Sequence, residues 1–87
     1  MADSPIEKLL KEGLPVQTAL NMVMFHWLTH LVAVSQLGGR WSIFLVNGYS
    51  VTDRLGTGTS LRDATTDALK GLSEQELEAA WREVTAP

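Results

Sequence analysis

Apolar residues recur at helical spacing near the start of the chain, from Ile6 to Leu10. Ser4 and Glu7 have the spacing of a capping box, in which each side chain accepts a hydrogen bond from the backbone of the other residue. Gly13 follows the last apolar position and is typical of a helix end. The pattern therefore predicts a short N-terminal helix.

The next segment, from Gly13 to Gly39, contains no charged residue. Pro15 suits the first turn of a helix, and the apolar positions that follow cover most of a helical wheel as far as Gln36. The segment predicts a long apolar central helix that ends at Gly38-Gly39 and is covered on most sides. Its length would allow a membrane span, but polar residues interrupt it and no basic cluster flanks it, so a soluble protein is expected.

A β-hairpin is predicted around Asn47-Gly48, because β-branched and aromatic residues flank this dipeptide on both sides. Both residues would occupy a type I′ turn, which needs positive φ at its two central positions. Such a turn would pair Val46 with Tyr49 and Phe44 with Val51. The pattern indicates no third strand.

Two helices are predicted after the hairpin. Ser60 and Asp63 resemble a helix start, and Ser73 with Glu76 has the full capping-box sequence before the last helix. The predicted order is helix, helix, strand, strand, helix, helix. Residues 1–87 are therefore expected to form one α+β domain.

Composition narrows the class of protein. The chain has 87 residues, a formal net charge of −3 and seven basic residues, which are scattered singly or in small pairs. Binding to a phosphate backbone needs clustered Lys and Arg, so nucleic acid is a disfavoured partner. The sequence has no cysteine and does not start like a signal peptide, which suits a reducing cytoplasm. We expect a cytoplasmic protein that does not bind membranes.

His26 and His30 are four residues apart, a spacing that places both imidazoles on one side of a helix and occurs in zinc-binding helices. Trp27 stands where the zincin motif has its glutamate, and no cysteine or nearby carboxylate offers a third ligand. We therefore expect two structural, partly buried imidazoles and neither a metal nor another cofactor. A metal or haem site and a pH-sensitive interface are the alternatives.

The sequence contains further residues that could take part in binding or catalysis. Gly56–Ser60 precedes a helix, where backbone N–H groups can hold an anion, but it lacks the lysine of a P-loop, so a loop with a helix cap is favoured. Trp41, Phe44 and Tyr49 could stack on bases, although core packing explains them more simply. The sequence shows no recognisable triad, in which a third residue orients a histidine toward a hydroxyl. No enzyme activity is therefore expected.

One stretch of the hairpin and the helix after it carries a family resemblance. Its residues are Trp41-Ser42-Ile43, Gly48-Tyr49, Gly58-Thr59-Ser60-Leu61, Ala64 and Ala68-Leu69. The stretch loosely resembles small phage-encoded accessory proteins and the strand-then-helix half of HicB-type antitoxins. The HicB-like pattern has a third strand, for which no counterpart is apparent. The resemblance implies a small protein that acts by binding another protein.

The surplus of apolar residues favours a non-enzymatic protein-binding module of accessory, inhibitory or regulatory type that forms a homodimer. So short a chain has few elements with which to cover an apolar helix on all sides. The expected interface residues are Phe25, Leu28 and Val32, which would form a ridge at helical spacing on the central helix, together with Trp41 and Ile43. The alternatives are a small-ligand or metal-binding domain that uses the two histidines, and nucleic-acid binding by the sheet.

Overall fold

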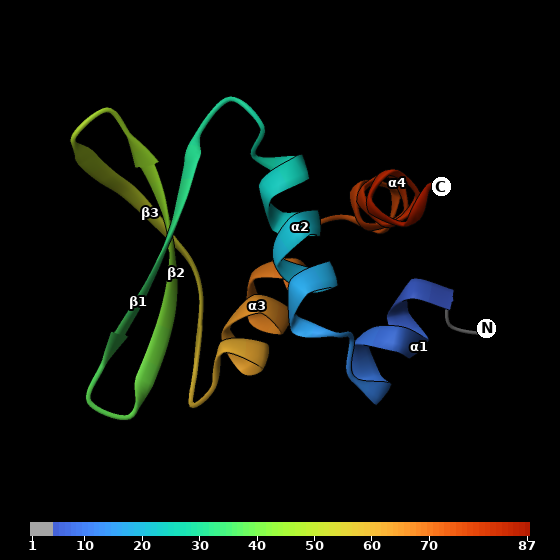
Figure 1. The fold of residues 1–87 in the computed structure, drawn as a ribbon, viewed down its shortest axis with the longest axis horizontal. Helices are drawn as coiled ribbons and strands as arrows, with labels where there is room; N and C mark the ends of the chain where they lie inside the picture. The colour runs from blue at the N-terminus through green and yellow to red at the C-terminus, as the bar shows by residue number, and fades with distance from the viewer. Residues whose placement is uncertain (1–4) are drawn as a thin grey trace.

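A computed structural model describes residues 5–87 and contains, over this range, four helices and three strands (Figure 1). In chain order the elements are α1 (Pro5–Glu12), α2 (Val16–His26), β1 (Leu31–Leu37), β2 (Arg40–Asn47), β3 (Ser50–Gly58), α3 (Leu61–Lys70) and α4 (Glu74–Thr85). The α+β class predicted from the sequence is confirmed. The N-terminal helix is short, as predicted, but its expected capping box involves Ser4, which lies outside the described residues.

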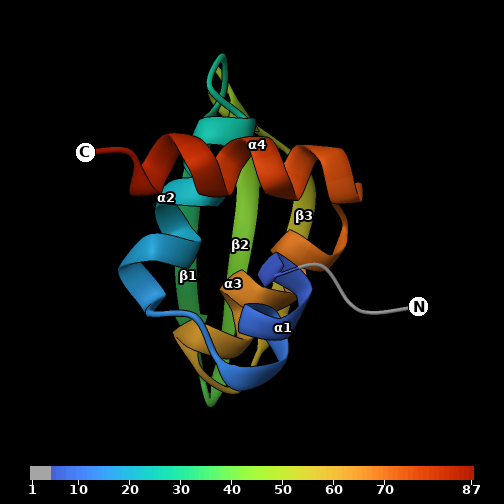
Figure 2. The same cartoon turned by 90° about the vertical axis from the view of Figure 1, so that its right-hand side faces the viewer.

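The sheet forms one layer, and the helices lie together on one side of it (Figures 1 and 2). Its strands are antiparallel in the order β1-β2-β3, so β2 is central and β1 and β3 are the edges. α3 contacts β2, β3 and α2, and α4 packs on the side of α2 that faces away from the sheet. Within residues 5–87, no helix covers the other face of the sheet (Figure 1).

The long central helix predicted from the sequence is wrong. α2 ends at His26, and the chain then turns into β1, which pairs with β2 along its whole length. Leu37 pairs with Arg40, so Gly38-Gly39 forms a two-residue turn between strands and does not end a helix. Strand pairing prevails over the apolar periodicity because β1 forms backbone hydrogen bonds with β2 and places Val32 against the core. Among the described residues, no helix is both long enough and apolar enough to span a membrane.

The predicted hairpin between β2 and β3 is present, but its turn lies one residue further along the chain. Gly48 and Tyr49 are the central turn residues, because Asn47 pairs with Ser50. Gly48 has a φ of 65°, and no described residue other than glycine has a positive φ. Positive φ at the first central position alone is the arrangement of a type II′ turn, not of the predicted type I′ turn.

The strand register predicted for this hairpin is therefore wrong. Val46 pairs with Val51, and Phe44 pairs with Arg54. Two register shifts of the β-bulge kind follow, and each adds one residue to β3 without adding one to β2. β3 continues to Gly58, so most of the segment expected to be a loop before the next helix is strand.

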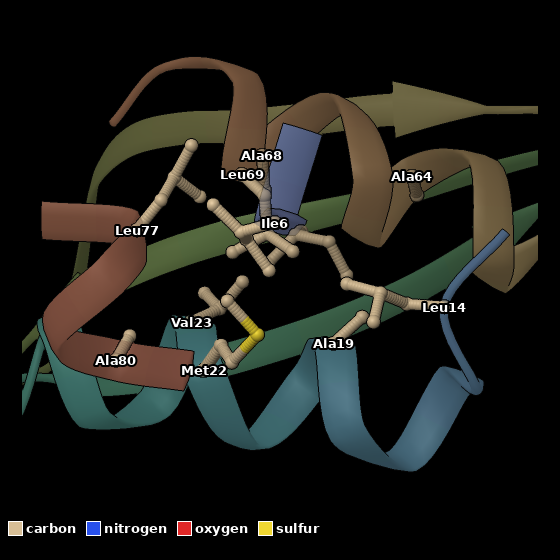
Figure 3. Packing of buried hydrophobic residues seen from close by; sticks show 11 residues of the cluster. Ile6, Leu14, Ala19, Met22, Val23, Ala64, Ala68, Leu69, Leu77 and Ala80 are labelled. Carbon is tan, nitrogen blue, oxygen red and sulfur yellow. The ribbon is translucent and has the colours of Figure 1, made fainter. Parts of the chain in front are cut away.

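The core fills the space between the sheet and α3 and the interior of the helical layer (Figure 3). Its large, fully buried apolar side chains come from α1, α2, β2, α3 and the connection before α2: Ile6, Leu14, Met22, Val23, Ile43 and Leu69. Each such side chain stabilises the fold by about 1.5–3 kcal/mol relative to exposure in water. The core therefore joins all the helices to the central strand.

β3 approaches α3 very closely at two glycines. A Cβ atom on Gly56 would lie 2.5 Å from the backbone nitrogen of Ala68, and a Cβ atom on Gly58 would lie 2.9 Å from that of Ala64. Side chains do not fit at such distances without displacing the helix. β3 and α3 can thus lie this close together because the strand has glycines and the helix has alanines at the contact.

Gly56→Ala is expected to lower the free energy of unfolding by about 2 kcal/mol or more, because the added methyl group pushes α3 away from the sheet. Gly39→Ala is a matched control, since no atom lies within 4 Å of a Cβ at that position. Urea denaturation of both variants measures the difference. Equal midpoints for the two variants would contradict the close approach of β3 and α3.

Gly48→Val is expected to destabilise the protein by at least about 1 kcal/mol, because a β-branched residue strongly disfavours positive φ. The parent residue has a φ of 65°. Ser50→Val places the same side chain at an exposed strand position beside the turn and serves as the control. Thermal unfolding measures both variants, and a melting temperature unchanged by Gly48→Val would argue against the turn.

Candidate functional site

An open groove lies beside β1, near the C-terminal ends of α2 and α4. Its volume is about 530 Å³, and it is lined by Asn21, Met24, Phe25, Leu28, His30, Leu31, Val32 and Val84. Six of these eight side chains are apolar. The molecule therefore offers a hollow apolar surface next to an edge of its sheet.

Three of the predicted interface residues meet in this groove: Phe25, Leu28 and Val32. They do not form a ridge on one helix, because Phe25 belongs to α2, Leu28 to the connection and Val32 to β1. Phe25 and Val32 also pack against the core, whereas Leu28 is 77% exposed. The chain reversal after α2 brings together side chains that the sequence suggested would share a helical stripe.

The other two predicted interface residues are not at this surface. Ile43 is fully buried and belongs to the core. Trp41 is partly buried and packs against the core cluster. Both side chains lie on the helix-covered face of β2, because residues two apart in a strand point to the same side. Ile43 is therefore corrected from an interface residue to a core residue.

Large apolar side chains are exposed mainly in one part of the chain. Of the seven that the described residues leave exposed, five fall between residues 24 and 37: Met24, Leu28, Leu31, Val34 and Leu37. Three of these are on β1, and sequence reasoning missed them because it placed them in a helix. The signal that would have identified them is the run of β-branched and small residues between Leu31 and the glycine pair.

The outer edge of β1 is suited to pairing with another strand. Within residues 5–87, β1 pairs with β2 only, and their register continues without a shift. The seven residues of β1 include no charge and no proline. Edge strands that avoid pairing usually carry charges, prolines or bulges. The opposite edge, β3, has Asp53, Arg54 and two register shifts, so only β1 lacks this protection.

The uncovered face of the sheet is apolar at the end next to the groove. Leu31, Val46 and Val51 lie opposite one another across the three strands. Toward the other end, the same face carries Ser35 beside Ser42. The apolar part of this face therefore continues the apolar surface of the groove around the edge of β1.

The two histidines have different polar partners, although both rings stand nearly perpendicular to the Trp27 ring. His26 Nε2 lies 3.4 Å from Glu76 Oε2, and His30 Nδ1 lies 3.1 Å from the Thr29 hydroxyl. The histidine and tryptophan ring centroids are 4.9 and 6.1 Å apart. His26 is partly buried, as expected, but His30 is exposed. In the part of the chain that the structure describes, no three His, Asp or Glu side chains gather as a metal ion would require.

The capping box predicted at the start of α4 is confirmed. The Ser73 backbone N–H donates to Glu76 Oε1 at 2.8 Å, and the Glu76 N–H donates to the Ser73 hydroxyl at 3.2 Å. These bonds to Ser73, with a smaller contribution from electrostatic attraction to His26, hold the pKa of Glu76 below its ordinary value. Glu76 thus links the first turn of α4 to the last residue of α2.

Gly56–Ser60, for which anion binding and helix capping were the two interpretations, caps α3. The Asp63 N–H donates to the Ser60 hydroxyl at 3.0 Å, so Ser60 caps α3 as predicted. The Thr57 N–H donates to Asp67 at 3.0 Å, and the Thr59 hydroxyl donates to Asp63 at 3.1 Å. Two carboxylates therefore occupy the side of this segment that an anion would approach, which disfavours anion binding.

Glu76→Gln is expected to lower the melting temperature at neutral pH, because the amide can still accept from Ser73 but has no charge. Since folding lowers the pKa of Glu76, its carboxylate stabilises the protein above the ordinary value of 4.5. This contribution disappears as pH falls below that value, so the difference between the parent and the variant should shrink. Glu74→Gln removes a charge from the same helical turn and controls for net charge. A difference that stays constant from neutral to acid pH would contradict this role.

Comparison of the chain with protein-family models, with curated proteins and with solved structures finds no match. The resemblance to phage accessory proteins and HicB-type antitoxins therefore stays a prediction. The features of this domain that bear on its function are the groove, the edge of β1 and the apolar end of the uncovered sheet face.

Proposed function

We propose that this domain is a non-enzymatic protein-binding module, of accessory, inhibitory or regulatory type, that acts as a homo-oligomer. The observation that carries the proposal is the gathering of exposed apolar side chains along β1 and its groove, including Leu28, Leu31 and Leu37. Scattered apolar side chains are normal on protein surfaces, but a contiguous apolar patch is typical of an interaction site.

The energetics favour a covered patch. Leu28, Leu31 and Leu37 are 77%, 67% and 83% exposed. Covering a large apolar side chain gains about 1.5–3 kcal/mol relative to leaving it in water. A groove next to a free strand edge also matches a common mode of recognition, in which a partner adds a strand and places side chains in neighbouring hollows.

The groove offers little for catalysis. Among its eight lining side chains, His30 is the only ionisable one, and Asn21 is the only other polar one. Acid–base and nucleophilic catalysis need a second group within hydrogen-bonding distance of the first. The nearest partner of the His30 ring is the neighbouring Thr29 hydroxyl, at 3.1 Å. A surface of this kind suits binding better than chemistry.

The two alternative functions receive less support from the geometry. A ligand held by both histidines would have to displace Glu76 from His26, since the carboxylate lies 3.4 Å away. Stacking of bases on the sheet needs aromatic side chains on one face. Trp41 and Phe44 differ by three positions in β2 and so lie on opposite faces.

Leu28→Glu tests the proposed function. Leu28 is 77% exposed, so the charge is expected to leave the fold intact while it disrupts the apolar surface. Tagged protein should lose at least about tenfold of its specifically co-purifying protein, measured by quantitative mass spectrometry. Gln75→Glu adds the same charge at an exposed position of α4 and should retain it. Equal recovery by both variants would contradict the proposed surface.

A further inference from the structure

We infer that the outer edge of β1 pairs with β1 of a second copy of the chain. The two strands run antiparallel about a two-fold axis at Val34, and the two sheets become one six-stranded sheet. This inference rests on the proposed function, because it names the oligomer through which the apolar surface is used. Three features of β1 support it: its outward backbone groups, its side-chain pattern and its lack of charge.

The outward backbone groups of β1 are spaced symmetrically about Val34. In a hairpin with a two-residue turn, the residues that flank the turn exchange both of their hydrogen bonds, and alternate residues do so along the ladder. Leu37 flanks the turn to β2, so residues at odd positions of β1 face β2. Val32, Val34 and Gln36 then direct their N–H and C=O groups outward. A two-fold axis at Val34 pairs it with itself and pairs Val32 with Gln36 of the partner subunit, which satisfies all three residues.

The exposed side chains of β1 have the same symmetry. Leu31, Val34 and Leu37 are the exposed large apolar residues of this strand, and they lie three positions before, at and three positions after the axis. Antiparallel pairing places Leu31 beside Leu37 of the partner subunit, and Val34 beside its own copy. An isologous contact requires this kind of self-complementary surface. A second copy therefore covers all three exposed side chains.

The charge distribution also favours a second copy over a charged peptide. No residue of β1 is charged, so two copies meet without like charges opposite each other, whereas an acidic or basic peptide gains no charged partner along this edge. β3 is less suited to such a contact, because Asp53, Arg54 and the two register shifts interrupt its edge. The expected dimer thus uses one edge of each sheet and leaves the other free.

The pairing also extends the groove. A two-fold axis perpendicular to the sheet keeps the helices of both copies on the same side of it. Leu31 lines the groove, and Leu37 of the partner subunit would lie next to it at the groove rim. The complete apolar surface would then be built from both copies.

A charge-pair experiment tests the position of the axis. Val34→Lys and Val34→Glu should each weaken dimerisation by at least about 100-fold, because like charges would face each other at the axis. An equimolar mixture of the two variants should recover a mass of two chains in analytical ultracentrifugation. Ser50→Lys adds a charge at an exposed position of β3, outside the apolar part of the uncovered face, and should leave the parent dimer unchanged. Far-UV circular dichroism confirms that each variant is folded.

A thiol cross-link keeps the proposal testable if the charged variants do not fold. The chain contains no cysteine, so Val34→Cys introduces a single thiol of similar size to the valine it replaces. Hydrogen-bonded antiparallel pairs have Cα atoms about 5.5 Å apart, within the range for a disulfide. Covalent dimers of Val34→Cys should form at least about tenfold faster than those of Val51→Cys.

Several results would overturn the inference. The first is a parent protein with the mass of one chain at all micromolar concentrations. The second is a mixture of folded Val34→Lys and Val34→Glu variants that does not recover the dimer. The third is an equal rate of cross-linking for Val34→Cys and Val51→Cys. The proposed function is tested by a separate measurement, the binding of partner proteins. Partner proteins that depend on Leu28 but bind a monomeric parent would support protein binding and refute the pairing of β1 with itself. A parent protein that neither dimerises nor binds a partner protein through Leu28 would refute both proposals.

Discussion

The contact between β3 and α3 is the constraint on which the rest of the architecture depends. Gly56 and Gly58 have no side chains, and α3 presents Ala64 and Ala68 to them, so the helix lies directly on the strand backbone. α3 in turn contacts β2 and α2, and α4 packs on the outer side of α2. A larger side chain at any of these four positions would move α3 and, with it, the core that includes Leu69.

The exposed surface is a consequence of this arrangement. Within residues 5–87 the helices lie on one face of the sheet, and α3 places them over β2 and β3. In this part of the chain, β1 has an uncovered edge, and its end of the sheet has an uncovered apolar face. The chain reversal between His26 and Leu31 places Phe25, Leu28 and Val32 around one groove beside this edge. The apolar surplus noticed in the sequence thus becomes a localised surface.

Several polar contacts in this domain cap its helices or join neighbouring elements. Glu76 completes the cap of α4 and also lies near His26 at the end of α2, so one carboxylate serves two helices. Ser60 caps α3, and Asp67 accepts a hydrogen bond from the end of β3. Among the described residues, no buried side-chain nitrogen or oxygen lacks a partner. The polar groups that resembled candidate sites in the sequence therefore make contacts within the fold.

Local patterns in the sequence determined the α+β class, the caps at Ser60 and Ser73 and the presence of a hairpin, because each depends on residues close together in the chain. The structure of residues 27–37 was decided by tertiary structure. This uncharged, apolar segment is compatible with either a helix or a strand, and pairing with β2 selects the strand. The register of β3 was likewise decided by contacts: the turn at Gly48-Tyr49 and the two bulges bring Gly56 and Gly58 under α3. Three residues of the candidate site were predicted, but Leu31, Val34 and Leu37 were missed, because a sheet edge exists only once the strands have paired.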